Sequence, residues 1–286
     1  MELINKKENI FGDDIAFIEQ YDFSTANLSE ENRIKAITTV ASICYQNPKA
    51  IGSESLYNRL LAESKGLPSS SFEFVPLLIP LIDLESYIDK VFYTLNIFKY
   101  GEIINYGNDL YLLTNYRAVV YDIEKGNLED KWFRYFNIPE ECEIIKQHFK
   151  VFQYKVDLPT RSQMVRHRCS WQELSRRYVS GERVPFEFYI SEKMENVESF
   201  YYWTDDQTSV YNTDEVINIC LNHYKQALSQ GVKPQEARRI IPQTAYTQIW
   251  GAFMPKQLDN YFKLRLDEHS QWEIRQTAIA MQELIS

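Results

Sequence analysis

The sequence has 286 residues and a mass of 33.9 kDa, with 31 Lys and Arg against 40 Asp and Glu, so its formal net charge is −9. Hydrophobic residues make up 44% and charged residues 25%, proportions that exclude a disordered chain, a collagen-like repeat and a disulfide scaffold. The acidic balance, with a sequence pI of about 5.1, also argues against a surface that binds nucleic acid or anionic membrane over its whole extent.

Nothing in the sequence indicates secretion, a membrane span or a metal centre. The first residues contain no apolar stretch of signal-peptide length, and the longest apolar run, residues 74–82, is interrupted by prolines. The isolated cysteines form no C-x-x-C pair and have no His at metal-ligand spacing; they are Cys44, Cys142, Cys169 and Cys220. We therefore expect reduced thiols, a cytoplasmic location, no membrane partner and no bound metal.

Two helices are predicted near the start of the chain, over residues 29–45 and 56–64. Ser29 is a suitable N-cap for the first because acidic residues follow it in the first turn. Gly66 and Pro68 would end the second.

The middle of the chain, residues 75–147, differs from the rest because it is dense in Tyr, Phe and Asn. Within it, residues 102–122 predict a β-hairpin of two β-rich runs around the turn at 107–109. Alternating apolar residues then predict a strand over 151–156, which Pro159 stops. We interpret residues 75–147 as an insertion within one domain that spans 1–286.

The final third of the chain is predicted to be helical. An apolar stripe with helical period indicates one helix that Gly231 closes, through Val216, Cys220, Tyr224 and Leu228. Three further helices are expected over 234–241, 255–266 and 268–285. Strands in the middle with helices on both sides predict a mixed α/β fold.

The arginine segment, residues 161–183, interrupts this acidic background. It holds six Arg, no Lys and only two acids, Glu173 and Glu182. In an extended chain Arg166 and Arg168 share one side, where two guanidinium forks suit a polyphosphate. Glu173 would stay ionised among these cations and could orient one of them.

Two other interpretations of the arginine segment remain open. Its arginines could form a solvated face or pair with the surplus acids, although a solubilising face would normally mix Lys with Arg. They could also bind single-stranded nucleic acid, with Trp171 and Tyr178 as stacking platforms, although the net negative charge disfavours this.

The residues of this segment resemble the signature of the flavin-dependent thymidylate synthases, the ThyX family. The matching positions are Gln163, Arg166, His167, Arg168, Ser170, Gln172, Glu173, Ser175, Arg177 and Tyr178. Six residues separate Arg168 from Ser175, where the family usually has seven, so the chain resembles a divergent member with a shortened loop. Aligning on Ser175 instead would place Val165 at the first Arg.

A second match lies in the final third, where residues 231–242 and 258–281 resemble the closing segments of the same family. The first segment offers Arg238, and the second offers Asn260, Arg265 and Trp272. Trp272 is expected in the core. Nearer the start, residues 41–45 and 70–73 are loosely similar to a helix end and a turn of the family. A flavin-binding His that often precedes this turn is absent, and Met254 stands where the family has an Asn or related residue.

The resemblance implies a ThyX-like fold, with a central mixed sheet flanked by helices, in a homotetramer whose subunits share active sites. It implies reductive methylation of dUMP to dTMP, with 5,10-methylenetetrahydrofolate as one-carbon donor and NADPH reducing FAD. The FAD-binding residues would be Ser70, Arg166, His167, Arg168, Glu173 and Asn260. The dUMP-binding residues would be Gln163, Arg166, Glu173, Ser175, Arg177, Arg238 and Arg265.

Arg265 would be catalytic, because a fixed cation beside the uracil edge stabilises negative charge on the ring. The chain has no G-x-G-x-x-G loop, which agrees with a flavin site built from arginines. Neighbouring arginines would lower the pKa of Cys169, but it matches no functional position and is interpreted as structural. Ser175 lacks an evident His and acid to activate it, so we interpret it as a nucleotide ligand. The alternative to an enzyme is a related flavin- or nucleotide-binding protein that has lost turnover.

Overall fold

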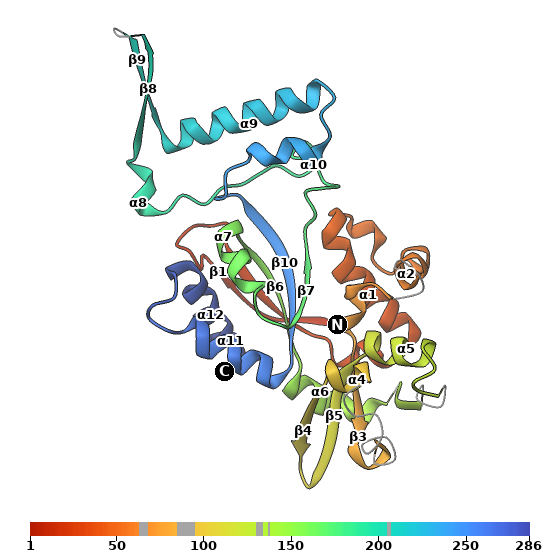
Figure 1. Ribbon diagram of the computed structural model, residues 1–286. Helices are drawn as coiled ribbons and strands as arrows, with labels where there is room; N and C mark the ends of the chain where they lie inside the picture. Colours follow the sequence, from red (N-terminus) through yellow and green to blue (C-terminus); the bar gives the residue numbers. More distant parts are fainter. Residues whose placement is uncertain (63–67, 85–94, 130–133, 137, 205–206) are drawn as a thin grey trace.

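A computed structural model describes residues 1–62, 68–84, 95–129, 134–136, 138–204 and 207–286. Its main sheet has five strands in the order β1-β2-β6-β10-β7. Their bounds are β1 Glu2–Glu8, β2 Phe17–Asp22, β6 Lys150–Asp157, β10 Tyr246–Phe253 and β7 Ser170–Glu173. Helices and strands alternate along the chain, which confirms the predicted mixed α/β class (Figure 1).

The strand directions differ from the mixed sheet that was expected. Every described pairing in the main sheet is antiparallel. β6 and β7 run in the same direction and are joined through helix α7 (Leu158–Met164), as in a parallel crossover. β10, which comes much later in the sequence, lies between β6 and β7 and pairs with both. The two parallel strands are therefore not paired with each other.

Helices cover both faces of this sheet (Figure 1). On one face α11 (Pro255–Arg265) and α12 (Trp272–Ile285) pack against β2, β6 and β10, while α1 (Glu30–Tyr45) packs on the other. Side chains alternate along a strand. Ile249 and Phe253 of β10 therefore join the core under α11 and α12, and Trp250 joins the core under α1. β10 is therefore buried on both faces, and its tight middle carries Gly251, where a Cβ would lie 2.6 Å from the Trp171 ring.

The insertion builds its own three-stranded sheet, in the order β3-β5-β4. The strands are β3 Pro76–Pro80, β5 Asp109–Asn115 and β4 Glu102–Tyr106, and the hairpin predicted around 107–109 is confirmed. The second β-rich run ends earlier than expected. Asn115 caps helix α5 (Tyr116–Glu124) by accepting from the backbone N–H of Ala118 at 3.0 Å, so the β-branched pair after it becomes helical.

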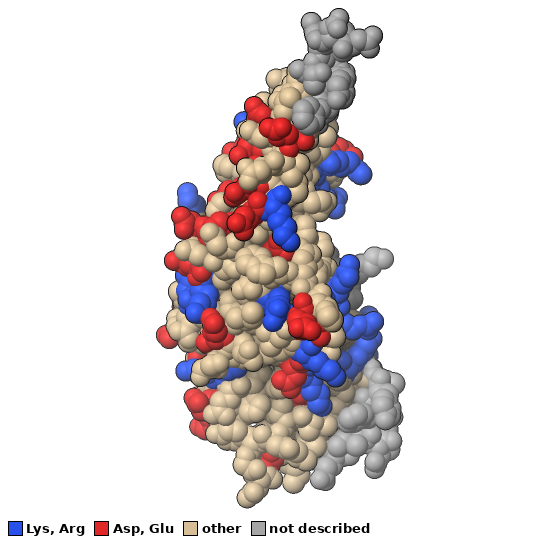
Figure 2. All heavy atoms as spheres, turned by 90° about the vertical axis from the view of Figure 1, so that its left-hand side faces the viewer, with Lys and Arg blue, Asp and Glu red and all other residues tan. Residues whose placement is uncertain are grey.

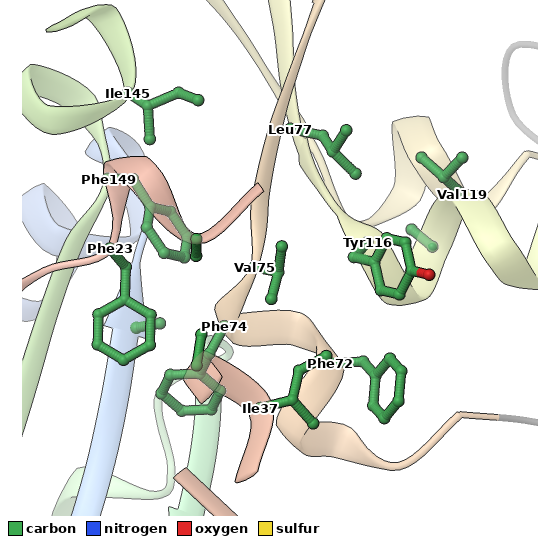
Figure 3. Close-up of a cluster of buried hydrophobic side chains, with 14 of the residues drawn as sticks. Phe23, Ile37, Phe72, Phe74, Val75, Leu77, Tyr116, Val119, Ile145 and Phe149 are labelled. Atoms are coloured by element: carbon green, nitrogen blue, oxygen red, sulfur yellow. The ribbon is translucent and has the colours of Figure 1, made fainter. Parts of the chain in front are cut away.

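The insertion shares a core with α1 instead of forming a separate one (Figure 3). Ile37 of α1 and Phe74 lie in the same cluster of buried side chains as Leu77, Val119 and Phe149 from the insertion and its boundary. The described residues of this part also include two short helices, α4 (Asn96–Lys99) and α6 (Cys142–His148). A continuous cluster of buried side chains therefore joins the described part of the insertion to α1.

The predicted helices near both ends are present. Ser29 caps α1 as expected, and α2 spans Glu54–Leu61, while its predicted stop at Gly66 lies outside the described residues. The stripe around Tyr224 forms α9 (Thr213–Ser229), and residues 234–240 form the short α10 (Pro234–Ala237) followed by a 3₁₀ turn. The final third is not wholly helical, because it also contains β10 and both strands of a hairpin.

That hairpin consists of β8 (Glu198–Thr204) and β9 (Gln207–Asn212) and follows the one-turn helix α8 (Glu192–Glu195). Together with α9 it extends away from the main sheet at the top of Figure 1. None of the helices in the described part of the chain has the length and apolar character to cross a bilayer. Within the same residues no cluster of His, Cys, Asp and Glu is arranged to hold a metal ion.

An arginine-lined cavity and a separate guanidinium–imidazole pair

A cavity of about 740 Å³, hereafter the main cavity, opens beside β7 where the end of α1 meets the arginine segment. Five of the predicted site residues line it. These residues, hereafter the cavity group, are Ser70, Glu173, Ser175, Arg177 and Arg238. The main cavity therefore joins three stretches of chain that are far apart in sequence.

Two guanidinium groups line this cavity and have no acidic partner in the part of the chain that the structure describes. Among the described residues neither Arg177 nor Arg238 forms an ion pair, and both side chains are exposed. Arg239 also lines the cavity, but Glu236 binds its Nε at 2.9 Å. Unpaired guanidiniums in a concave site make it attractive to anions, because their donors can bind a phosphate or carboxylate in a fork geometry.

Glu173 orients an arginine, as expected, and the arginine is Arg161. Two nitrogens of Arg161 donate to the two carboxylate oxygens of Glu173 in a bidentate ion pair. Asp157 caps α7 by accepting from the backbone N–H of Thr160 at 3.2 Å, which fixes the helix that carries Arg161. Sequence reasoning had placed Arg161 at the edge of the arginine segment without assigning it a role, because only the fold brings α7 against β7.

Gln172 is a second residue that sequence reasoning did not assign to the site. Its side-chain carbonyl accepts from the Ser70 hydroxyl at 2.7 Å, and its amide donates to the Cys44 sulfur at 2.8 Å. The Cys44 carbonyl in turn accepts from the backbone N–H of Ser175 at 3.1 Å. Gln172 thus links the Ser70 turn, the end of α1 and the arginine segment around one wall of the cavity.

Helix α9 holds the loop that follows Arg177. The backbone N–H of Gly181 donates to the Tyr224 hydroxyl at 2.9 Å, and a Cβ at Gly181 would lie 2.6 Å from the Phe186 ring. Phe186 packs edge-on against Tyr224, with ring centroids 5.3 Å apart. The Arg176 guanidinium lies 4.1 Å from the Phe186 centroid and donates to two backbone carbonyls nearby. Arg176 is therefore a structural cation of the loop.

The insertion contributes to the same cavity through the Ser70 turn. Arg117 of α5 donates through Nε to the Pro68 carbonyl at 2.8 Å and forms an ion pair with Glu73. These contacts clamp both ends of the turn that presents Ser70 to the cavity. A role for residues 75–147 in positioning Ser70 follows from this clamp.

The remaining predicted residues lie on α7 and α11 or directly after α7, and they do not line the main cavity. Arg265, at the end of α11, donates from Nε to His167 Nε2 at 2.8 Å and from Nη2 to the Gln163 carbonyl oxygen at 3.0 Å. His167 is buried, and its ring lies 4.7 Å from that of Tyr261. Burial and the neighbouring charge of Arg265 lower the pKa of His167 to about 4, so a neutral imidazole accepts this hydrogen bond.

The chain around His167 forms a turn followed by bends, not the extended segment considered from the sequence. Arg166 and Arg168 are exposed, whereas His167 between them is buried, so the two guanidiniums point away from the core. Asn260, on α11, is also exposed. The α7–α11 group, as we call this set, consists of Gln163, Arg166, His167, Arg168, Asn260 and Arg265.

Three expectations are corrected by the environment of the side chains. Burial raises the pKa of the Cys169 thiol well above its ordinary value, so the arginines do not activate it and its structural role stands. Trp171 is half-buried and packs edge-on against Phe253, at 5.4 Å between centroids, so it does not stand free on the surface. Trp272, expected in the core, is 49% exposed because it begins α12 at the surface.

Charge on the exterior is mixed, and Figure 2 shows acidic and basic side chains interspersed over one face of the molecule. The fold and the site together define a mixed α/β protein with a cavity lined by several arginines. A family model described as "Thymidylate synthase complementing protein" matches residues 126–286, more than half of the chain. The chain belongs to this family, and every predicted site residue except Ser70 lies within the match.

Curated relatives are named flavin-dependent thymidylate synthases. One from Thermotoga neapolitana is 31% identical over 134 residues, which cover 46% of this chain and 59% of the relative. One from Pyrococcus furiosus is 34% identical over 125 residues, covering 42% of this chain and 47% of the relative. The chain thus spans about half to three fifths of the length of these two proteins.

A solved structure, that of a UMP/dUMP methylase from Streptomyces cacaoi bound with 5-Br dUMP, is 19% identical to the chain. The match covers 47% of this chain and 64% of the other, with a TM-score of 0.37, too low to define the fold.

Proposed function

We propose that this protein is a flavin-dependent thymidylate synthase that methylates dUMP to dTMP, using 5,10-methylenetetrahydrofolate and FAD reduced by NADPH. The observation that carries the proposal is the main cavity, in which Arg177 and Arg238 face open space without an acidic partner among the described residues. Membership of the thymidylate synthase complementing protein family supplies the chemistry that such a cavity would serve.

The residues present fit both a nucleotide and a flavin. Phosphate groups require forked cations, which Arg177 and Arg238 provide, and planar rings require aromatic faces, which Tyr45 and Tyr178 provide at the cavity rim. Ser175 would add hydroxyl and backbone donors to the nucleotide. In the cavity group Ser70 and Glu173 would support the cofactor, and FAD, when bound, supplies the hydride that completes the methyl group.

Arg265 has the most direct chemical role in this proposal. Its guanidinium is held by His167 and Gln163 and keeps its charge beside a neutral imidazole, so it forms a preorganised cation. Placed at the uracil edge, such a cation would stabilise negative charge on the ring and make C5 a better nucleophile without a covalent enzyme adduct. No nucleophilic cysteine is needed, in agreement with the buried Cys169 thiol.

The separation of the cavity group from the α7–α11 group supports a shared active site. We expect a homotetramer in which the α7–α11 group of one subunit completes the main cavity of another. In it, Arg166, His167, Arg168 and Asn260 would contact the flavin, and Gln163 and Arg265 would contact the nucleotide. The single-domain organisation, with residues 75–147 inserted into it, belongs to the same proposal.

Tritium release from C5-labelled dUMP tests the proposal directly. Purified protein, supplied with FAD, methylenetetrahydrofolate and NADPH, should release tritium to water, and omission of any one of these should stop it. Flavin absorbance measured on the same sample separates the alternatives. Uptake of FAD with no tritium release would identify a binding protein without turnover, and failure to take up FAD would refute both.

A further inference from the structure

A second cavity, of about 420 Å³, lies next to the main one and shares Tyr45 with it. Its walls come from the end of α1, from α2 and its N-cap, and from the arginine segment, and they include Ser53, Arg59 and Arg183. None of the residues predicted to bind a ligand lines it. The side cavity, as we call it, is therefore an unassigned extension of the proposed site.

Two guanidinium groups in the side cavity have no acidic partner in the described part of the chain. Within the described residues neither Arg59 nor Arg183 forms an ion pair, although the chain carries 40 acidic residues against 31 basic ones. Arg183 instead donates to the Gln46 carbonyl at 3.4 Å, which satisfies one donor and leaves the rest of its fork available. In a chain with surplus acids, two uncompensated arginines on one cavity leave it with a local positive charge.

An unbroken row of aromatic rings and cations connects the two cavities. The Arg177 guanidinium lies 5.2 Å from the Tyr178 centroid, and the Arg59 guanidinium lies 5.8 Å from that of Tyr45. Between them the Tyr45 and Tyr178 rings are 5.5 Å apart. A ligand that occupies the main cavity could thus extend past two rings and meet a second pair of guanidiniums.

The backbone fixes the wall between the cavities. Gln46, directly after α1, adopts a left-handed conformation with φ of 48°, which few non-glycine residues adopt. Its side-chain amide donates to Gln248 of β10 at 2.9 Å, which ties this turn to the sheet. The turn directs residues 47–53 back beside Tyr45, where they form the side cavity together with α2.

We propose that the side cavity is an anion subsite that binds the charged tail of a ligand whose ring system occupies the main cavity, with Arg59 and Arg183 as its ligands. This inference rests on the proposed function, which supplies two co-substrates with such tails. One is a folate, which carries carboxylates on its glutamate tail, and the other is NADPH, which carries a 2′-phosphate that NADH lacks. Both present the anionic oxygens that guanidinium forks bind.

Equilibrium binding distinguishes the two sources. Affinities are measured with FAD-loaded protein for tetrahydrofolate carrying one or three glutamates, and for NADPH against NADH. Wild-type protein should bind the more highly charged member of one pair about tenfold more tightly or better, as expected for charge-assisted contacts. The variant with both Arg59→Ala and Arg183→Ala should lose most of that preference while binding the less charged member as before.

The matched control is Arg134→Ala, which removes an exposed arginine of the insertion far from either cavity in sequence and should keep the preference. Arg59→Lys should keep part of it, because the charge remains while the fork is lost. The subsite is refuted if wild-type protein shows no preference within either pair, or if the double variant retains it. Protein that binds neither the folate nor the dinucleotide contradicts the proposed function itself, which separates the two failures.

Discussion

The two groups of predicted site residues differ in how the protein treats their charges. In the cavity group, Arg177 and Arg238 are exposed and pair with no acid among the described residues. In the α7–α11 group, Arg265 is held by His167 and Gln163, with the imidazole buried and neutral. The first arrangement leaves binding capacity available for a ligand, whereas the second fixes one cation in place.

This difference suggests a division of labour. A guanidinium with no protein partner contributes little to stability but much to ligand binding, since a phosphate would satisfy its donors for the first time. A guanidinium already held by a neutral acceptor keeps its position before any ligand arrives, which is the requirement for electrostatic preorganisation. Substitutions in the two groups should therefore separate binding, turnover and stability.

The largest effect is expected at the fixed cation. Arg265→Ala should lower tritium release from dUMP by about 10²–10³-fold, the scale typical for loss of one preorganised electrostatic contact. Lys263→Ala, two residues earlier on the same helix, removes an exposed charge and serves as the control. Turnover of the Arg265 variant within a few-fold of wild type would remove the distinction between the two groups.

The next effect concerns the unpaired cations of the cavity group. Arg238→Ala should weaken dUMP binding by about 10- to 100-fold, as expected for loss of a hydrogen bond to a charged group, with little change in melting temperature. Isothermal titration and thermal unfolding on the same samples measure both quantities. Arg239→Ala, whose guanidinium pairs with Glu236, should weaken dUMP binding much less. Equal losses in both variants would contradict the importance of an unpaired guanidinium.

The pH dependence of stability should report on the buried imidazole of the α7–α11 group. The pKa of His167 falls from its ordinary 6.5 to about 4 in the folded protein, because of burial first and the charge of Arg265 second. The unfolded chain binds the extra proton between these values, so stability present above pH 6.5 is lost as the pH falls toward 4. The loss should be about 1–3 kcal/mol.

Urea unfolding at pH 7.5 and pH 5 measures this loss. His167→Gln should unfold with a weaker pH dependence over that interval, since no imidazole remains to take up the proton. The exposed His269→Gln is the matched control and should behave as wild type. Identical pH profiles for wild type and His167→Gln would show that the imidazole is not held neutral.

A smaller pH effect on stability, of opposite sign, is expected in the insertion. It tests whether the loss of unfolding free energy at acid pH comes from the α7–α11 group alone. Burial first, and the nearby Glu140 second, raise the pKa of Glu141 from 4.5 to about 8. Stability from this group is therefore present below pH 4.5 and lost as the pH rises through 8. Glu141→Gln should raise the unfolding free energy at pH 8.5 by about 1 kcal/mol, with the exposed Glu143→Gln as control. An unchanged value would mean that Glu141 is solvated.

Local signals in the sequence predicted much of the fold. Ser29 as a cap, the turn at 107–109 and the period of α9 each act within a few residues, and each is present in the structure. The predictions of secondary structure were wrong where tertiary packing determines whether a segment is a strand or a helix. β10 is buried on both faces, so its apolar run carries no period that separates strand from buried helix, and α5 overrides the β propensity of its residues through the Asn115 cap.

The candidate site also contains residues that local sequence signals identify and residues that they do not. The arginine segment was recognisable because Arg-only composition and motif spacing are local properties. The Glu173 partner Arg161, the Gln172 bridge and the clamp from Arg117 were not, because each joins elements that only the sheet brings together. The pKa of Cys169 was expected to fall near the arginines, but its burial, a tertiary property, raises the pKa instead.

The position of β10 has a consequence for how the chain is made. β6 and β7 leave the ribosome long before residues 246–253, yet each pairs with β10 and both cores need its side chains. Until those residues emerge, β10 is missing from the sheet, and the backbone groups of β6 and β7 that would pair with it have no partner strand. We therefore expect the nascent chain to be exposed to aggregation from the synthesis of β6 until that of β10, and to complete both cores late.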